Sequence, residues 1–189
     1  MTLQHILTGI GIVYGGSEVA VAFALRSRGN VARGADRGSL AILWTTITLA
    51  VVASIQVLSR GAARLPGPML AWAAAGTAVV LAGLALRWTA ILTLRSAFTV
   101  DVAIARDQRV VEHGIYHALR HPAYTGSLVA FLGMALTYGD WLAGLVLFLP
   151  IAAAFSYRIH VEERALRAAF GEVYDRYASR TKRLVPFVY

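Results

Sequence analysis

Long apolar runs separated by short polar loops dominate the sequence, and they extend over residues 3–25, 40–58, 69–94, 123–138 and 141–157. A helix needs about 20 apolar residues to cross the hydrocarbon core of a bilayer. The pattern therefore predicts an all-α integral membrane protein with five transmembrane helices. The first run lacks a basic segment before it and is too long for a cleaved signal peptide, so we expect it to remain as a helix.

The spacing near the C-terminus predicts further helices. Only Gly139 and Asp140 separate the last two runs, which indicates a tight hairpin, and Pro150 is expected to bend its second helix. The stretch 161–178 repeats apolar residues every three or four positions, with Glu and Arg opposite, as is typical of amphipathic helices. Gly171 is expected to divide this stretch into two short helices. We expect them to cap a cofactor pocket on the cytoplasmic side.

Composition and charge agree with a membrane protein. Hydrophobic residues make up 58% of the 189 residues and charged residues 15%, against roughly 45–50% and about 25% in soluble domains. Four arginines fall in the first loop, four in the third, and seven basic residues follow the last span, but only two basic residues fall in the other loops together. The positive-inside rule then places the N-terminus outside and the C-terminus in the cytoplasm of an inner or cell membrane.

The net charge of +8 does not indicate nucleic-acid binding. Basic residues beside the spans face anionic headgroups, and no soluble stretch interleaves them with stacking aromatic residues. The absence of cysteine excludes disulfides, thiolate catalysis, Fe–S clusters and cysteine-ligated zinc.

Small and ionisable residues inside the runs are also informative. Gly11 and Gly15 form a GxxxG pair, which favours close helix packing within the chain. Glu18 and Arg87 would each cost about 2.5–3.5 kcal/mol if they were central and unpaired. We expect each to lie near an interface or beside a polar partner, and lining a polar cavity is the alternative.

Three histidines, His113, His117 and His121, stand at positions i, i+4 and i+8, which would align them on one helix as metal ligands. Gly114 and Pro122 oppose a helix there, and five histidines are too few for a di-iron hydroxylase. We expect no metal, and we expect the first two histidines to be solvated loop residues.

Two separated motifs carry the chemical information. The first reads G-I-Y-H-A-L-R-H-P-A-Y-T-G over residues 114–126, and the second reads R-I-H-V-E-E-R-A-L and then F-G over residues 158–171. They resemble the isoprenylcysteine carboxyl methyltransferase family, whose pattern is G-x-Y-x-x-x-R-H-P-x-Y-x-G, then R-x-x-x-E-E-x-x-L-x-x-x-F-G-x-x-Y. The match continues through Tyr174 and Pro186. Residues 95–189 therefore form the expected catalytic region, and residues 1–94 supply three membrane helices.

The resemblance implies S-adenosyl-L-methionine as the methyl donor, bound without a Rossmann sheet; no G-x-G-x-x-G follows a strand. It implies that Arg158 contacts the substrate and that Arg158 and Glu162 are catalytic. Glu163 is expected to be an ordinary acidic residue in the first turn of a helix. By position, the cofactor contacts fall on Gln108, Arg109, Val110, Val111, Tyr116, His121, Pro122, Ala123, Tyr124 and Glu162.

The charges favour a carboxylate as the methyl acceptor. A carboxylate is ionised at pH 7 and needs no general base, and Arg158 can hold it through two parallel hydrogen bonds. Arg158 lies four residues before Glu162, so the two share a face if one helix continues through both. We therefore expect a membrane enzyme that methylates the carboxylate of an isoprenoid-like or lipidic substrate entering from the bilayer.

Other functions stay open at this point. Phospholipid N-methyltransferases and some sterol reductases carry related R-H-P-x-Y motifs, so amine methylation and an NADPH-dependent reductase are alternatives. Amine methylation would find Arg158 repulsive, and a reductase would need a second phosphate site and a hydride path. A small transporter or scaffold would need more polar residues in its spans. The sequence leaves open the natural acceptor (a small lipid, a quinone-pathway acid or a peptide carboxylate) and the oligomeric state.

Overall fold

The structure, a computed structural model, describes residues 16, 38–61, 63–94 and 110–185. Within these ranges all regular elements are helices, and the β-type pairing is limited to two isolated bridges. The expected first span and the loop at 95–109 lie outside the described residues. The elements are α2 (Ser39–Arg60), α3 (Met69–Leu94), the 3₁₀ helix η2 (Gly114–His117), α4 (Pro122–Thr137), α5 (Trp141–Phe170) and α6 (Glu172–Arg180).

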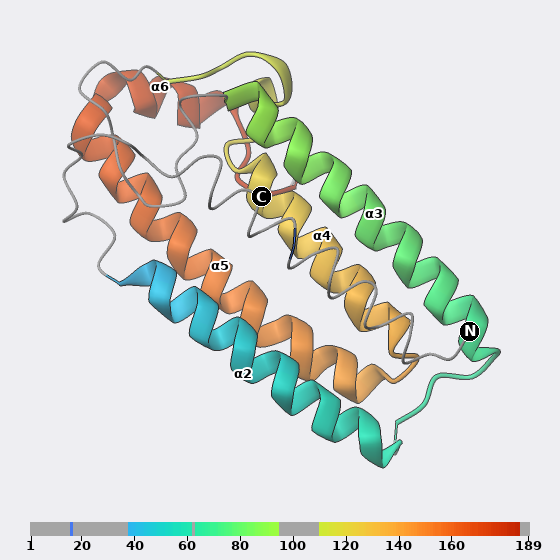
Figure 1. The fold of residues 1–189 in the computed structure, drawn as a ribbon. Helices are drawn as coiled ribbons and strands as arrows, with labels where there is room; N and C mark the ends of the chain where they lie inside the picture. Colours follow the sequence, from blue (N-terminus) through green and yellow to red (C-terminus); the bar gives the residue numbers. More distant parts are fainter. Residues whose placement is uncertain (1–15, 17–37, 62, 95–109, 186–189) are drawn as a thin grey trace.

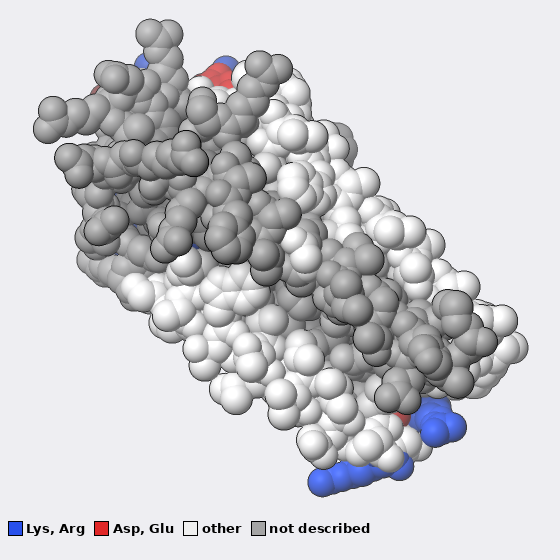
Figure 2. Space-filling model, in the orientation of Figure 1, with Lys and Arg blue, Asp and Glu red and all other residues white. Residues whose placement is uncertain are grey.

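Three of the described helices, α2, α3 and α5, are long and apolar enough to cross a membrane. Helix α4 has 16 residues and is about 24 Å long, which is shorter than a hydrocarbon core of about 30 Å. Described charged side chains gather toward the two ends of the bundle on the face in Figure 2. The described helices therefore agree with a membrane protein, whereas five spans stay a prediction.

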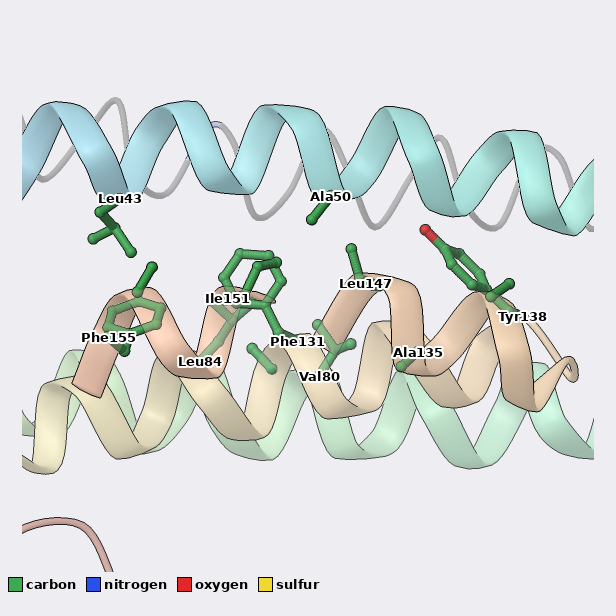
Figure 3. Packing of buried hydrophobic residues seen from close by; sticks show 13 residues of the cluster. Leu43, Ala50, Val80, Leu84, Phe131, Ala135, Tyr138, Leu147, Ile151 and Phe155 are labelled. Carbon is green, nitrogen blue, oxygen red and sulfur yellow. The ribbon is translucent and has the colours of Figure 1, made fainter. Parts of the chain in front are cut away.

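The long helices pack as two pairs (Figure 1). Helix α3 runs along α4, α2 runs along α5, and α4 packs on α5 to join the pairs. Figure 3 shows the apolar cluster that fills the space between them: Leu43 and Ala50 of α2 face Leu147, Ile151 and Phe155 of α5. Close packing on this scale fixes the ends of the helices relative to one another.

Glycines bring α3 and α4 into backbone contact. Gly76 and Gly83 stand seven residues apart on α3, as do Gly126 and Gly133 on α4. A Cβ added at Gly83 would lie 2.5 Å from the backbone nitrogen of Ala130 and 2.6 Å from the carbonyl oxygen of Gly126. Membrane helices use small residues in this way because close approach gains van der Waals contact.

The expected hairpin between α4 and α5 is present. Gly139 adopts a left-handed φ of 55°, and Asp140 caps α5, since its Oδ1 accepts a hydrogen bond from the backbone of Ala143 at 3.0 Å. Its Oδ2 accepts a hydrogen bond from the backbone N–H of Ala63 at 3.2 Å. The loop between α2 and α3 is thereby attached to the hairpin at the end of the bundle opposite α6 (Figure 1).

Helix α5 is longer than the apolar run that predicts it. It continues through Pro150 and past the end of the run to Phe170, for 30 residues in all. Gly171, with a φ of 52°, separates it from α6 as expected. The expectation of two short helices after the span is wrong in its first half, because the stretch that begins at Val161 extends α5. Only α6 is a short helix.

Adding a methyl group at Gly83 tests the contact between α3 and α4. We expect Gly83→Ala to destabilise the fold by about 1–3 kcal/mol, because the new Cβ overlaps backbone that cannot move aside. The same change at Gly144 is the control, since its Cβ would meet Ala135 at an ordinary 3.5 Å. Thermal melting in detergent measures both, and equal melting temperatures would contradict the contact.

Candidate functional site

Residues 182–184 cross the turn that precedes α4. The backbone N–H of Arg120 donates to the carbonyl of Lys182 at 2.7 Å, and that of His121 donates to the carbonyl of Arg183 at 3.1 Å. In return, the N–H of Lys182 donates to the carbonyl of Ala118 at 3.2 Å. The first sequence motif and residues 182–183, about sixty positions apart in the chain, therefore meet at one end of the bundle.

Side chains reinforce this junction. The Tyr177 hydroxyl of α6 donates to the carbonyl of Tyr116 in η2 at 2.8 Å, and Thr125 donates to the carbonyl of Leu184 at 2.8 Å. Burial, followed by the nearby Glu162 carboxylate, raises the pKa of Tyr116 far above its usual range. Burial likewise raises the pKa of Tyr177. Both phenols therefore stay protonated and neutral at physiological pH.

His121 stands at the centre of the junction, immediately before Pro122, the first residue of α4. Proline suits that helix position because its φ is already helical and its missing N–H is not needed there. The His121 ring stacks on Tyr124 with centroids 5.6 Å apart. Its Nδ1 lies 3.9 Å from Glu162 Oε2, and its Nε2 lies 3.5 Å from Glu163 Oε1. One imidazole thus faces two consecutive carboxylates of α5.

Arg158 directly follows the apolar run of α5 and is only 2% exposed. Its Nε donates to the Tyr124 hydroxyl at 3.1 Å, and its Nη1 donates to the Ser39 hydroxyl of α2 at 2.8 Å. Because α5 is continuous from Arg158 to Glu162, the two residues stand one turn apart on one helix, as the spacing predicts. Tyr124 links Arg158 to His121, and His121 in turn faces Glu162.

Arg87 supports the same junction from α3. It is 7% exposed, and its Nη1 donates to the Ser127 hydroxyl at 2.9 Å and to the carbonyl of Ala123 at 3.4 Å. The expectation that Arg87 has polar partners is confirmed. Glu18, the other ionisable residue of the runs, lies outside the described residues.

Glu163 is not the acidic first-turn residue that the sequence suggests. It lies deep inside α5 with a fully buried side chain. Its carboxylate is 3.0 Å from Arg120 Nε, 3.0 Å from Arg183 Nη2 and 3.4 Å from Arg167 Nη1. The expectation fails because α5 does not end with the apolar run, so no new helix begins at this position.

Comparison with known proteins agrees with this arrangement. A family model described as phospholipid methyltransferase matches residues 71–173. A probable protein-S-isoprenylcysteine O-methyltransferase of Oryza sativa subsp. japonica is 30% identical over 181 residues, which cover 94% of this chain and 92% of the relative. The chain belongs to the isoprenylcysteine carboxyl methyltransferase family. The relatives are named as methyltransferases, so this member is an enzyme of that class.

Other members of the family extend this finding. Protein-S-isoprenylcysteine O-methyltransferase B of Arabidopsis thaliana is 33% identical over 115 residues, covering 60% of this chain and 58% of the relative. A solved structure of a eukaryotic intramembrane Ras methyltransferase, isoprenylcysteine carboxyl methyltransferase, matches with a TM-score of 0.57 and 26% identity. That match covers 77% of this chain and 52% of the solved one. The chain thus spans little more than half the length of these two relatives.

The structure gathers most of the residues that the resemblance to the methyltransferase family singles out. Tyr116, Pro122 and Ala123 are buried at the junction, and Val111 packs against the cluster that contains Tyr116 and Ala123. Val110 is half-buried just before them. Gln108 and Arg109 lie outside the described residues, so their roles stay predictions.

The histidine triplet does not form a shared face in this methyltransferase. His113 and His117 are exposed, whereas His121 is buried. The 3₁₀ helix ends at His117 and α4 begins only at Pro122, so no single helix aligns the three rings. Among the residues that the structure describes, no group of three or more His, Cys, Asp or Glu side chains has an arrangement that could hold a metal ion.

A single hydroxyl tests the junction between η2 and α6. We expect Tyr177→Phe to lower the stability of the methyltransferase by about 1–3 kcal/mol, because the buried carbonyl of Tyr116 would lose its donor. Tyr157→Phe is the control. Because Tyr157 is 42% exposed, water or lipid headgroups can satisfy any polar group that its hydroxyl contacts. Thermal melting compares the two variants, and a Tyr177→Phe protein as stable as the control would show that the junction does not depend on this bond.

Proposed function

We propose that this enzyme transfers a methyl group from S-adenosyl-L-methionine to a carboxylate oxygen of a lipophilic substrate. The observation that carries the proposal is the placement of Arg158 and Glu162 one turn apart on α5, both beside the stacked pair of His121 and Tyr124. One rigid helix then holds the acceptor contact and the donor contact together. Such positioning can contribute about 7–11 kcal/mol to a reaction between two bound partners.

The residues present fit the proposed methyl donor. Glu162 Oε2 is buried and has no hydrogen-bond partner among the described residues. An unsatisfied buried oxygen of this kind costs free energy, and the hydroxyl or amino groups of an adenosyl ligand would satisfy it. Tyr116 and Tyr124 belong to the same junction, and we propose that their rings pack against the adenosyl group. When bound, the cofactor supplies an electrophilic methyl group on a sulfonium.

Arg158 supplies the acceptor contact in this proposal. Its guanidinium keeps its charge at every physiological pH, and the hydroxyls of Tyr124 and Ser39 fix its orientation. A carboxylate held by this cation is already a nucleophile, so no residue has to remove a proton. An amine or ammonium acceptor would be repelled by Arg158, which favours O-methylation. This choice agrees with the O-methyltransferase names of the relatives.

The acceptor and its route are proposed from the position of Arg158. Residue 158 follows directly after the apolar run of α5, between helices long enough to lie in lipid. A substrate with an apolar tail can therefore bring its carboxylate to Arg158 from the side, through the bilayer. An S-isoprenylated cysteine, as in the names of the relatives, has this chemistry, and so has a small lipidic acid.

The orientation in the membrane is proposed from charge. The junction lies at the end of the bundle that holds α6 (Figure 1). The arginine-rich residues after the apolar run of α5 lie in this part of the chain, and we assign this end to the cytoplasm. A water-soluble donor reaches it from that side. The chemistry is assigned to residues 95–189, although Ser39 and Arg87 from the first half support Arg158 and the start of α4.

Substitutions at different residues should distinguish binding of the methyl donor from binding of the methyl acceptor. We expect His121→Ala and Glu162→Ala to weaken binding of S-adenosylhomocysteine about tenfold or more, because each removes a hydrogen bond to a charged or polar ligand group. Arg158→Ala should keep that affinity within about twofold but abolish methyl transfer to N-acetyl-S-farnesylcysteine. Calorimetry measures the affinity. Arg164→Ala, an exposed arginine of the same helix, is the control, and unchanged affinity in both of the first two variants would refute the assignment.

The product distinguishes an ester from an amine. With a donor labelled in its methyl group, we expect membranes containing this enzyme to form a product that releases volatile labelled methanol in base, because methyl esters hydrolyse there. Label that resists base would indicate N- or C-methylation instead. A thermal shift with S-adenosylhomocysteine and none with NADPH would separate the methyltransferase from a reductase.

A further inference from the structure

The Glu163 carboxylate joins three separate segments of the chain. It faces Arg120 and His121 from the turn before α4, Arg167 from the next turn of α5, and Arg183 from the tail. Its side chain is fully buried. A buried carboxylate is stable only when cations and hydrogen bonds surround it, so the position of each of these partners is tied to Glu163.

The neighbouring carboxylate of Glu162 is partly exposed and less fully paired. Glu162 keeps 29% of its side chain exposed, and its Oε2 accepts no hydrogen bond from the residues that the structure describes. Consecutive residues point about 100° apart around a helix, so the two carboxylates approach His121 from different sides. Glu163 is occupied by cations of the protein itself, whereas Glu162 retains an oxygen for a ligand.

The tail, defined as residues 181–185, is held by the same carboxylate. Arg183 contacts Glu163 through Nε at 3.2 Å and through Nη2 at 3.0 Å, which is a two-pronged contact. The carbonyl of Arg183 accepts from the backbone N–H of His121. A shift of the tail would therefore move the backbone of His121 directly.

We infer that Glu163 is a positioning residue of the methyl-donor site. Its carboxylate fixes His121 and the tail against α5, so that His121 and Glu162 face the same ligand. Glu163 does not itself contact the ligand, because three guanidinium groups already cover its oxygens. This inference rests on the proposed function for the identity of the ligand.

Glu163→Gln tests the inference, because it keeps the size of the side chain and removes its charge. We expect the dissociation constant for S-adenosylhomocysteine to rise about tenfold, the scale of one lost hydrogen bond to a charged group. The fraction of molecules that bind should stay near that of the wild type in calorimetry. Glu163→Asp, which restores the charge, should recover part of the affinity. Trypsin should also cut after Lys182 and Arg183 about tenfold faster in Glu163→Gln than in the wild type.

Glu112→Gln is the matched control. Glu112 forms an ion pair with Arg180 of α6, so it too joins the segment before α4 to the C-terminal part of the chain, but both side chains are substantially exposed. Exposed pairs contribute little, and we expect the affinity and the rate of tail cleavage to match the wild type. A role in overall stability alone would lower the fraction of Glu163→Gln molecules that bind and leave their affinity unchanged, and that result would overturn the inference.

Two further outcomes are informative. If Glu163→Gln does not fold, Arg183→Gln breaks the same contact from a residue whose side chain is 31% exposed. This change removes the trypsin site after residue 183, so an unchanged affinity together with an unchanged rate of cleavage after Lys182 would overturn the inference. A wild-type chain that does not bind S-adenosylhomocysteine would refute the proposed function. The cleavage comparison then still decides whether Glu163 holds the tail, since equal rates would refute that part as well.

Discussion

The buried charge of Glu163 is the constraint on which the junction of the two motifs depends. A carboxylate without solvent needs compensating cations, and the chain supplies them from the turn before α4, from α5 and from the tail. No one of these segments could bury its charges alone. The contact therefore selects one relative placement of segments that are far apart in sequence, and His121 lies where they meet.

The glycine contact between α3 and α4 supports this junction from the membrane side. Because Gly83 and Gly126 let the two backbones touch, the end of α3 reaches the first turn of α4. Arg87 can then donate to Ala123 and Ser127 while it stays buried. Packing inside the bundle thus holds the first turn of α4 in place, and this turn positions His121 and Tyr124.

The sequence predicts most of the helices. The features that it does not predict depend on contacts between segments far apart in the chain. Apolar run lengths predict α2, α3 and the hairpin, because burial in lipid depends on local composition. The end of α5 is not predicted, since its last turns are stabilised by contacts of Glu163 with distant segments rather than by local hydrophobicity. Likewise, the seven-residue glycine spacing gains meaning only once α3 and α4 are known to be neighbours, whereas the recognisable pair at Gly11 and Gly15 lies outside the described residues.

In the proposed reaction, the extra length of α5 lets a water-soluble donor and a lipid-borne acceptor meet. Thirty residues make a helix of about 45 Å, which exceeds a hydrocarbon core of about 30 Å. The helix therefore continues from lipid into the polar junction without a break. Arg158 stands at the end of its apolar part and Glu162 about 6 Å further along its axis. In the proposed reaction, the separation of the two binding contacts is set by one helical turn, so no movement between domains is needed to bring them together.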